Sequence, residues 1–235
     1  MNAPCVLMAS GHSITLRAPD PALLKPIGAV AHSLAQINRF CGHAHRPYSV
    51  AEHSLLVSDL LMDTYGPLAA LAGLMHDAHE ALIGDCTSPV KAEMRRLASA
   101  RSFEASHLPH GRAYSDFDRV EACAQAAIRA TFGLITISHL FEQEVHAADM
   151  VALATERRDL MPEHPEAWEC LHGVSPSPRT FTDLMDRSRC SFSWTDWRDA
   201  FIERYQELDF SRREAEAQGG QSLKAQLSPA FARRA

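Results

Sequence analysis

The sequence predicts an all-α protein with a small β-hairpin at its N-terminus. Apolar residues recur at helical spacing in successive segments between residues 27 and 208. Helix-starting residues such as Ser49 and Ser88 precede some of these segments, and glycine or proline follows others. With 46% hydrophobic and 22% charged residues, the 235-residue chain can bury the core of one large globular domain.

The composition argues against several classes of protein. A net charge of −6 disfavours a broad nucleic-acid surface, and an aromatic content of only 7% disfavours a stacking platform for single strands. The six cysteines contain no C-x-x-C pair, which argues against a zinc ribbon and fits a reduced compartment. No segment is long and apolar enough to span a bilayer, and we expect no secretory leader. We therefore expect a cytoplasmic protein that binds neither nucleic acid nor membrane.

The N-terminal extension, residues 1–22, is expected to contain the hairpin. Two β-prone runs, residues 5–8 and 14–17, flank a turn of small residues. Prolines then break the chain, and a first helix is expected from Ile27 to about Asn38.

The loop that follows this helix mixes arginines, histidines and aromatic residues without any helical or strand period. Arg39 could bind a phosphate through two parallel hydrogen bonds, and Phe40 could stack on a flat ring. The alternative is a solvated loop whose aromatic residues only cover the core.

Ser49 and Glu52 have the spacing of a capping box, so the next helix should begin at Ser49 and end near Tyr65. His53 falls on the apolar side of this helix and therefore points inward. A single inward histidine is more often a hydrogen-bonded core residue than a metal ligand. That balance changes if the next helix also directs ligand-type side chains inward.

Residues 74–85 place acidic and imidazole groups in an otherwise apolar helical pattern. On a continuous helix His76, Asp77 and Glu80 share one arc, whereas His79 falls on another side. The residues before this stretch carry no charge, which is typical of a helix buried on most sides. Buried His and Asp side chains need partners, and together they supply half of the coordination sphere of a divalent metal.

The next two expected helices contribute one candidate site residue. Ser88 as N-cap and Pro89 at the first position predict a helix start that suits an anion, and Lys91 adds a positive charge there, unless it is an ordinary surface lysine. We expect a long exposed loop from Arg101 to Ser115, which could be a lid. A structural helix should then open at Asp116 or Asp118.

A further helix is expected over residues 139–161, with Asp149 on its apolar side. An inward aspartate is costly unless it is paired or binds metal, so Asp149 is either a ligand or the partner of Arg157 or Arg158. Glu156 shares the side of Asp149 and is expected to hold a partner of the ligands.

The C-terminal part is expected to contain a linker and a docking helix in residues 166–210, followed by a flexible tail, residues 211–235. The apolar stripe from Trp197 to Leu208 could cover the core of its own chain or a second subunit. A homodimer or a higher homo-oligomer is thus one of two outcomes.

These ligand-type residues stand in the order His, His-Asp, Asp on three helices. This order resembles the HD-domain phosphohydrolase superfamily, whose helical bundle would occupy residues 23–165. Shorter motifs resemble those of bacterial 5'-deoxynucleotidases and viral dATP triphosphohydrolases. They are Arg39-Phe40, V-A-E-H ending at His53, H-D-A-H-E from His76 to Glu80, G-D at Asp85, S-P-V-K ending at Lys91 and A-D at Asp149.

The resemblance implies one divalent transition metal, namely cobalt, manganese, zinc, iron or nickel, with magnesium as an additional ion. Such a metal would activate water and polarise a phosphoryl oxygen of a small nucleotide substrate. The implied metal ligands are His53, His76, Asp77 and Asp149.

The resemblance also assigns the remaining motif residues. Glu80 and Asp85 would orient the attacking water and donate a proton to the leaving 5' oxygen, in roles that the sequence does not divide between them. Arg39 and Lys91 would bind phosphate, and Phe40 would line the sugar and base pocket. The 5'-deoxynucleotidases carry Trp where this chain has Phe40, so discrimination against the 2'-hydroxyl is in doubt.

Several functions remain open at this point. Removal of a 5' phosphate from a monophosphate competes with hydrolysis of a deoxynucleoside triphosphate, in which Glu80 and Asp85 would bind further metals. A di-iron oxygenase or a cyclic-dinucleotide phosphodiesterase would need additional histidines, for which His107 and His110 are the candidates. A nucleotide sensor with a vestigial site would have no need of Glu80 and Asp85.

Overall fold

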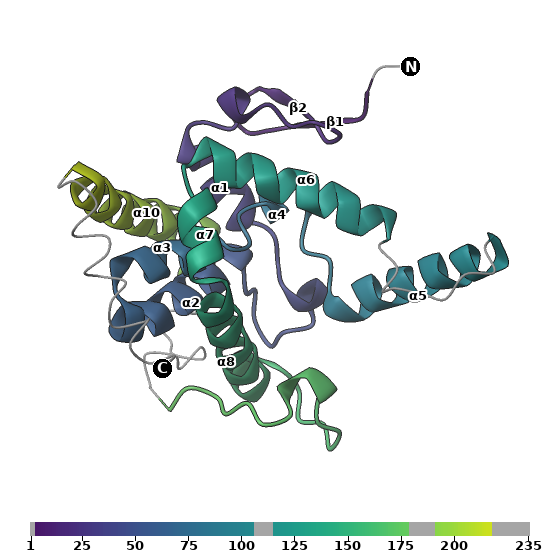
Figure 1. The fold of residues 1–235 in the computed structure, drawn as a ribbon. Helices are drawn as coiled ribbons and strands as arrows, with labels where there is room; N and C mark the ends of the chain where they lie inside the picture. The colour runs from purple at the N-terminus through teal and green to yellow at the C-terminus, as the bar shows by residue number, and fades with distance from the viewer. Residues whose placement is uncertain (1–2, 106–114, 179–190, 218–235) are drawn as a thin grey trace.

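A computed structural model describes residues 3–105, 115–178 and 191–217, and these residues form a predominantly helical fold (Figure 1). Helices α2 and α3 pack closely on each other, α8 packs on both, and α10 contacts α1, α2 and α3. No described helix is long and apolar enough to cross a membrane. The helices are α1 (Ile27–Leu34), α2 (Val50–Tyr65), α3 (Pro67–Leu74), α4 (Glu80–Ile83), α5 (Ser88–Ala105), α6 (Asp116–Thr131), α7 (Ile135–Leu140), α8 (Glu142–Leu160) and α10 (Trp194–Ala217).

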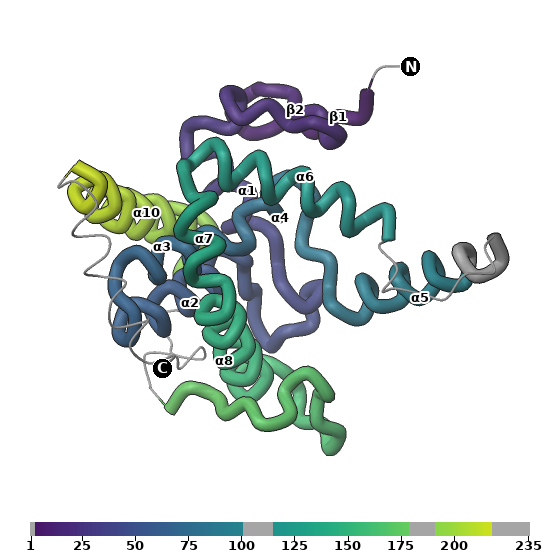
Figure 2. Tube along the Cα trace, viewed as in Figure 1, coloured from purple at the N-terminus to yellow at the C-terminus, as the bar shows by residue number. Residues whose placement is uncertain are grey.

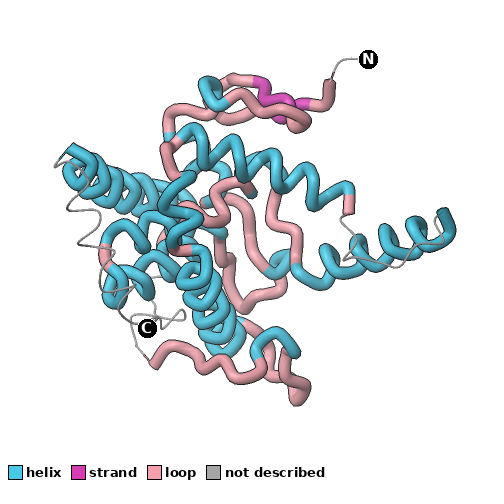
Figure 3. Tube along the Cα trace, in the orientation of Figure 1, coloured by secondary structure: helices cyan, strands magenta, loops and turns pink. Residues whose placement is uncertain are grey.

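The N-terminal hairpin is present as expected. Strand β1 (Cys5–Leu7) pairs antiparallel with β2 (Ser13–Thr15), and Val6 lies opposite Ile14. Ile14 is completely buried, which attaches the hairpin to the helical body. In Figure 3 the two strands of this hairpin are the magenta segments, and the other described residues are drawn as helices and loops.

Local signals fix the ends of α2. The Ser49 hydroxyl accepts a hydrogen bond of 3.2 Å from the Glu52 backbone N–H at the helix start. At the other end Gly66 adopts a φ of 80°, a conformation that favours glycine, and Pro67 then begins α3. The expected start and end of this helix are therefore confirmed.

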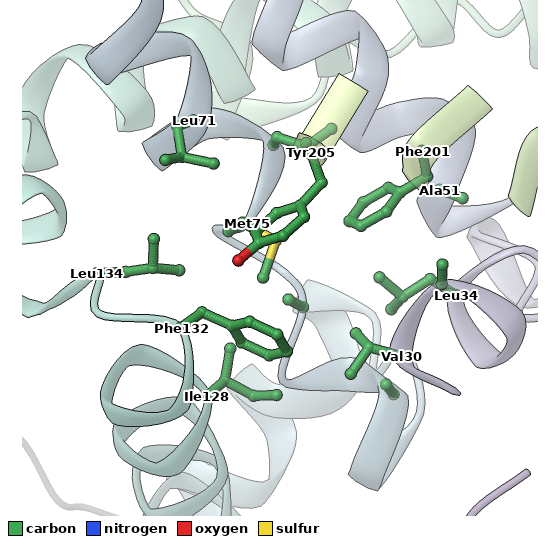
Figure 4. Close-up of a cluster of buried hydrophobic side chains, with 14 of the residues drawn as sticks. Val30, Leu34, Ala51, Leu71, Met75, Ile128, Phe132, Leu134, Phe201 and Tyr205 are labelled. Carbon is green, nitrogen blue, oxygen red and sulfur yellow. The ribbon is translucent and has the colours of Figure 1, made fainter. Parts of the chain in front are cut away.

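The apolar stripe of α10 covers the core of its own chain. Phe201 and Tyr205 project into a cluster that also contains Met75 and Phe132 (Figure 4). The Phe132 and Tyr205 rings meet edge to face with centroids 5.6 Å apart. Of the two expected roles of this stripe, the intramolecular one is the one observed.

Several boundaries differ from the sequence-based expectation (Figure 2). Helix α1 ends at Leu34, before the expected end near Asn38, and the helix expected from residue 139 begins at Glu142, after the separate short helix α7. Residues 74–85 are not one helix, because α3 ends at Leu74, the chain turns through residues 75–79, and α4 begins at Glu80. Helix α5 continues to Ala105, so the loop expected from Arg101 begins later; residues 106–114, with His107 and His110, lie outside the described residues. Helix α10 extends to Ala217, past the expected start of the tail.

Candidate metal centre

The turn between α3 and α4 carries His76 and Asp77. Gly73, in the last turn of α3, lies so close to α2 that a Cβ atom there would overlap Leu61 Cδ1 and approach Val57 Cγ1 to 3.2 Å. The carbonyl oxygen of Gly73 faces Nδ1 of His76 at 2.7 Å and can accept its N–H. Gly73 therefore has two roles: it lets α3 pack closely on α2, and its carbonyl oxygen orients the ring of His76.

The expected metal ligands converge from three parts of the fold: α2, this turn and α8. His53 Nε2 lies 3.2 Å from Asp149 Oδ1 and 3.6 Å from Asp77 Oδ2. His76 Nε2 lies 3.2 Å from Asp77 Oδ2 and 3.9 Å from Asp149 Oδ1. Ligand atoms bound at about 2.1 Å to one ion stand roughly 3.0–3.4 Å apart, so these separations are close to those of a coordination sphere.

Both histidines present a free ring nitrogen to this point. His53 Nε2 and His76 Nε2 are buried and have no hydrogen-bond partner among the described residues. Their other ring nitrogens are engaged, since His53 Nδ1 lies 2.5 Å from Glu156 Oε1 and His76 Nδ1 faces the carbonyl of Gly73. Metal-ligating histidines have this arrangement, in which one nitrogen binds the ion and the other N–H is held by an oxygen. The donor set thus fits a divalent metal ion, and His53, His76 and Asp149 alone could hold one.

Glu156 contacts three described residues around the expected metal ligands. This carboxylate of α8 is fully buried, and it accepts a hydrogen bond of 2.8 Å from Tyr48 in addition to its contact with His53. It also forms an ion pair of 3.2 Å with Arg39. Glu156 thus contacts the expected ligand His53 itself, and it also holds Arg39, which lies beside the expected ligand Asp77.

Within the described part of the chain, no ion pair joins Asp149 to Arg157 or Arg158. Arg157 donates a hydrogen bond of 2.7 Å to the carbonyl oxygen of Glu166, and Arg158 forms an ion pair with Asp159. Asp149 instead faces His53 and His76, as a metal ligand would.

The carboxylates give the centre a preference for positive charge. Burial and the nearby Arg39 oppose protonation of His53, yet Glu156 and Asp149 outweigh them and raise its pKa to about 10. Burial likewise disfavours the charged form of Asp77, but His76 and His53 hold its pKa well below the usual value. A cation in the centre would satisfy the same carboxylates.

The two expected catalytic acids lie beside the centre. Glu80, the first residue of α4, is buried, and its Oε2 has no hydrogen-bond partner in the described part of the chain. Burial together with the charges of Asp77 and Asp85 raises the pKa of Glu80 to about 9. Burial also raises the pKa of Asp85, which follows α4. Glu80 is therefore protonated at neutral pH in the metal-free protein.

Arg39 connects the expected substrate residues to the ligands. Its Nη1 lies 3.7 Å from Asp77 Oδ2, and its guanidinium carbon lies 5.4 Å from the centre of the Phe40 ring. The loop is held in an unusual shape, because Phe40 and Cys41 have φ angles of 56° and 51°, in the left-handed region. The Phe40 ring also lies near the Trp168 ring, with centroids 6.1 Å apart.

The sequence did not reveal every residue at this site. Lys91 Nζ lies 2.5 Å from Oε1 of Glu121 on α6, a helix that its pattern marks as structural. The same Glu121 oxygen lies 3.4 Å from His79 Nε2. Nor did the sequence pair Phe40 with Trp168 or Tyr48 with Glu156. These contacts depend on which helices and loops pack together, and no local pattern signals them.

Comparison with known proteins gives two relatives. No protein-family model matches the chain. The uncharacterized protein YfdR of Escherichia coli strain K12 is 34% identical over 148 residues, which cover 63% of this chain and 68% of YfdR. An uncharacterized protein of Rhodobacter capsulatus is 32% identical over 159 residues, which cover 65% of this chain and 71% of that protein.

Proposed function

The chain belongs to the same family as YfdR of Escherichia coli, and we propose that it is a metal-dependent phosphohydrolase that removes the 5' phosphate from (deoxy)nucleotides. The observation that supports this proposal most is the convergence of His53 Nε2 and His76 Nε2, both buried and without hydrogen-bond partners in the described chain, on the carboxylates of Asp77 and Asp149. The order of these residues resembles the HD-domain phosphohydrolases.

His53, His76, Asp77 and Asp149 would hold a divalent transition metal, with cobalt, manganese, zinc, iron and nickel all compatible with imidazole and carboxylate donors. When bound, such an ion lowers the pKa of a water ligand and polarises a phosphoryl oxygen.

The other site residues supply binding and proton transfer. Arg39 and Lys91 bind the phosphate oxygens as cations, and Phe40 lines the sugar and base pocket. As water attacks the phosphorus, the bond from phosphorus to the 5' oxygen breaks, and that oxygen takes a proton. Glu80 suits the role of proton donor because burial and the charges of Asp77 and Asp85 raise its pKa to about 9 in the metal-free protein. Asp85 orients the attacking water beforehand and accepts its proton during the attack.

A second candidate is hydrolysis of deoxynucleoside triphosphates. It is favoured by a second group of ligand atoms, contributed by Asp77, His79 and Glu80, that lie within 4.8 Å of one another. A further cation there, such as magnesium, would help to neutralise a longer phosphate chain.

Product analysis tests both candidates. The cobalt- or manganese-loaded protein is incubated with ribo- and deoxynucleoside mono- and triphosphates, with Glu80→Gln as the matched inactive control. Nucleoside and phosphate from monophosphates alone would support the nucleotidase. Release of triphosphate or of successive phosphates would support the second candidate, and no turnover of any nucleotide would overturn both in favour of a sensor.

A further inference from the structure

Helix α5 carries Lys91 but has few attachments to the body of the protein. It reaches away from the bundle in Figure 1, and α6 is the element that it contacts most. Among the described side chains, Lys91 forms an ion pair with Glu121 near the candidate metal centre, and Arg95 forms one with Asp118 one turn further along α5. The position of Lys91 therefore depends on α6.

Glu121 does more than pair with Lys91. Its Oε1 lies 2.5 Å from Lys91 Nζ and 3.4 Å from His79 Nε2, so a single oxygen bridges α5 and the turn that carries Asp77. His79 is buried and Lys91 and Glu121 are mostly buried, which restricts the motion of all three side chains. The bridge leads directly to the centre, because a ring nitrogen of His79 lies within 4.8 Å of carboxylate oxygens of Asp77 and Glu80.

The negative charge of Glu121 also determines where the ammonium group of Lys91 lies. Without it, Lys91 would keep its contact with the Phe117 ring of α6, whose centre lies 6.0 Å from Nζ, but it would lose its ion pair there and could turn toward Glu80 and Asp77, whose charges already act on it. A lysine drawn onto these acids would be lost to an incoming phosphate. A lysine held by Glu121 keeps its remaining N–H donors for the phosphate.

We propose that Glu121 is a positioning residue that holds Lys91 and His79 at the phosphate-binding side of the metal centre. The inference rests on the proposed function for its kinetic consequence, but its effect on phosphate binding is independent of turnover. Glu121 touches neither substrate nor metal and acts through Lys91.

The test compares Glu121→Gln with Arg95→Gln. Both substitutions remove one ion pair between α5 and α6, but only Glu121→Gln breaks the link to Lys91 and His79. We expect Glu121→Gln to raise the KM for nucleoside monophosphates, and the Kd for inorganic phosphate in calorimetric titrations of the metal-loaded protein, by about tenfold with kcat nearly unchanged. Arg95→Gln should leave both constants unchanged, and Glu121→Asp should recover part of the loss.

A double-substitution cycle with Lys91→Met separates positioning from a structural role. If Glu121 acts through Lys91, the protein with both substitutions should bind phosphate no more weakly than Lys91→Met alone. Full additivity of the two losses would overturn the proposal, as would equal effects of Glu121→Gln and Arg95→Gln. If no nucleotide is hydrolysed, the proposed function fails, whereas the phosphate titrations still decide the role of Glu121.

Discussion

The two sides of the candidate site are built in opposite ways. On the α2 and α8 side, Glu156 and His53 are fully buried, and Arg39 is 11% exposed. On the α5 and α6 side, Lys91 and Glu121 are 21% and 19% exposed, and Arg95 is 39% exposed. The difference indicates that His53 and Arg39 are held from behind by a buried network, whereas Lys91 is held by groups that water can reach.

The largest effects should come from removing an expected metal ligand in the turn between α3 and α4. We expect His76→Ala and Asp77→Ala to lose the metal and to reduce turnover by at least about 10³-fold, because the remaining ligands leave the coordination sphere incomplete. Metal content by mass spectrometry and initial rates test this. His139→Ala, at an exposed histidine of α7, is the control. Metal retained at full stoichiometry in Asp77→Ala would contradict its assignment as a ligand.

The next largest effect is expected from Glu156, the buried carboxylate that contacts His53 and Arg39. Glu156→Gln keeps the shape of the side chain but leaves the charges of Arg39 and His53 buried without their carboxylate. We expect the free energy of unfolding to fall by about 3–5 kcal/mol and the metal affinity to fall by roughly 10- to 100-fold. Urea titration and metal competition measure the two losses, with exposed Glu169→Gln as the control. An unchanged midpoint of urea unfolding would show that the contacts of Glu156 with His53 and Arg39 do not stabilise the fold.

Acidity should weaken metal binding on the same side. His53 has a pKa of about 10 in the metal-free protein and is protonated at neutral pH, so a metal that takes its Nε2 must displace a proton from the ring. Affinity should therefore fall as the pH is lowered, by about tenfold per unit for each proton released, and level off above pH 10. Calorimetry in buffers of different ionisation enthalpy counts the protons. Zero proton release at pH 7 would refute this account.

The smallest effect is expected on the open side. Arg95→Gln removes a partly exposed ion pair with Asp118, so the free energy of unfolding should fall by less than about 1 kcal/mol. The pair also lowers the pKa of Asp118 to about 2, which is below its value in the unfolded chain. Its stabilisation is therefore present above about pH 4 and is lost as the pH falls toward 2. Thermal melts at pH 7 and pH 3 should differ less in Arg95→Gln than in the parent protein.

The sequence predicts those parts of the structure that local patterns determine. Helical periodicity placed His53 and Asp149 on inward faces, and the cap at Ser49 marked the start of α2, because burial and capping act over a few neighbouring residues. It also placed Glu156 on the side of Asp149, where the structure has it behind His53.

The sequence could not predict features that depend on how distant segments pack. Helix α3 ends at Leu74, one residue after Gly73 approaches α2 closely, and a helical wheel contains neither feature. The wheel therefore set His79 apart from Asp77 and Glu80, although all three lie together at the turn. Glu121 was missed because α6 shows an ordinary amphipathic pattern, and its carboxylate gains a role only when α5 docks beside it.

The turn between α3 and α4 has a consequence for how such a site can diversify. On one continuous helix, His76 and Glu80 would be locked in a fixed rotation, and any change in the packing of α4 would swing the ligand pair. Because the turn separates them, α4 and the residues after it can be exchanged while His76 and Asp77 stay in place against α2. The proposed proton donor and the proposed metal ligands could then vary independently, so that the residues facing a substrate would change without any change in those that would hold the ion.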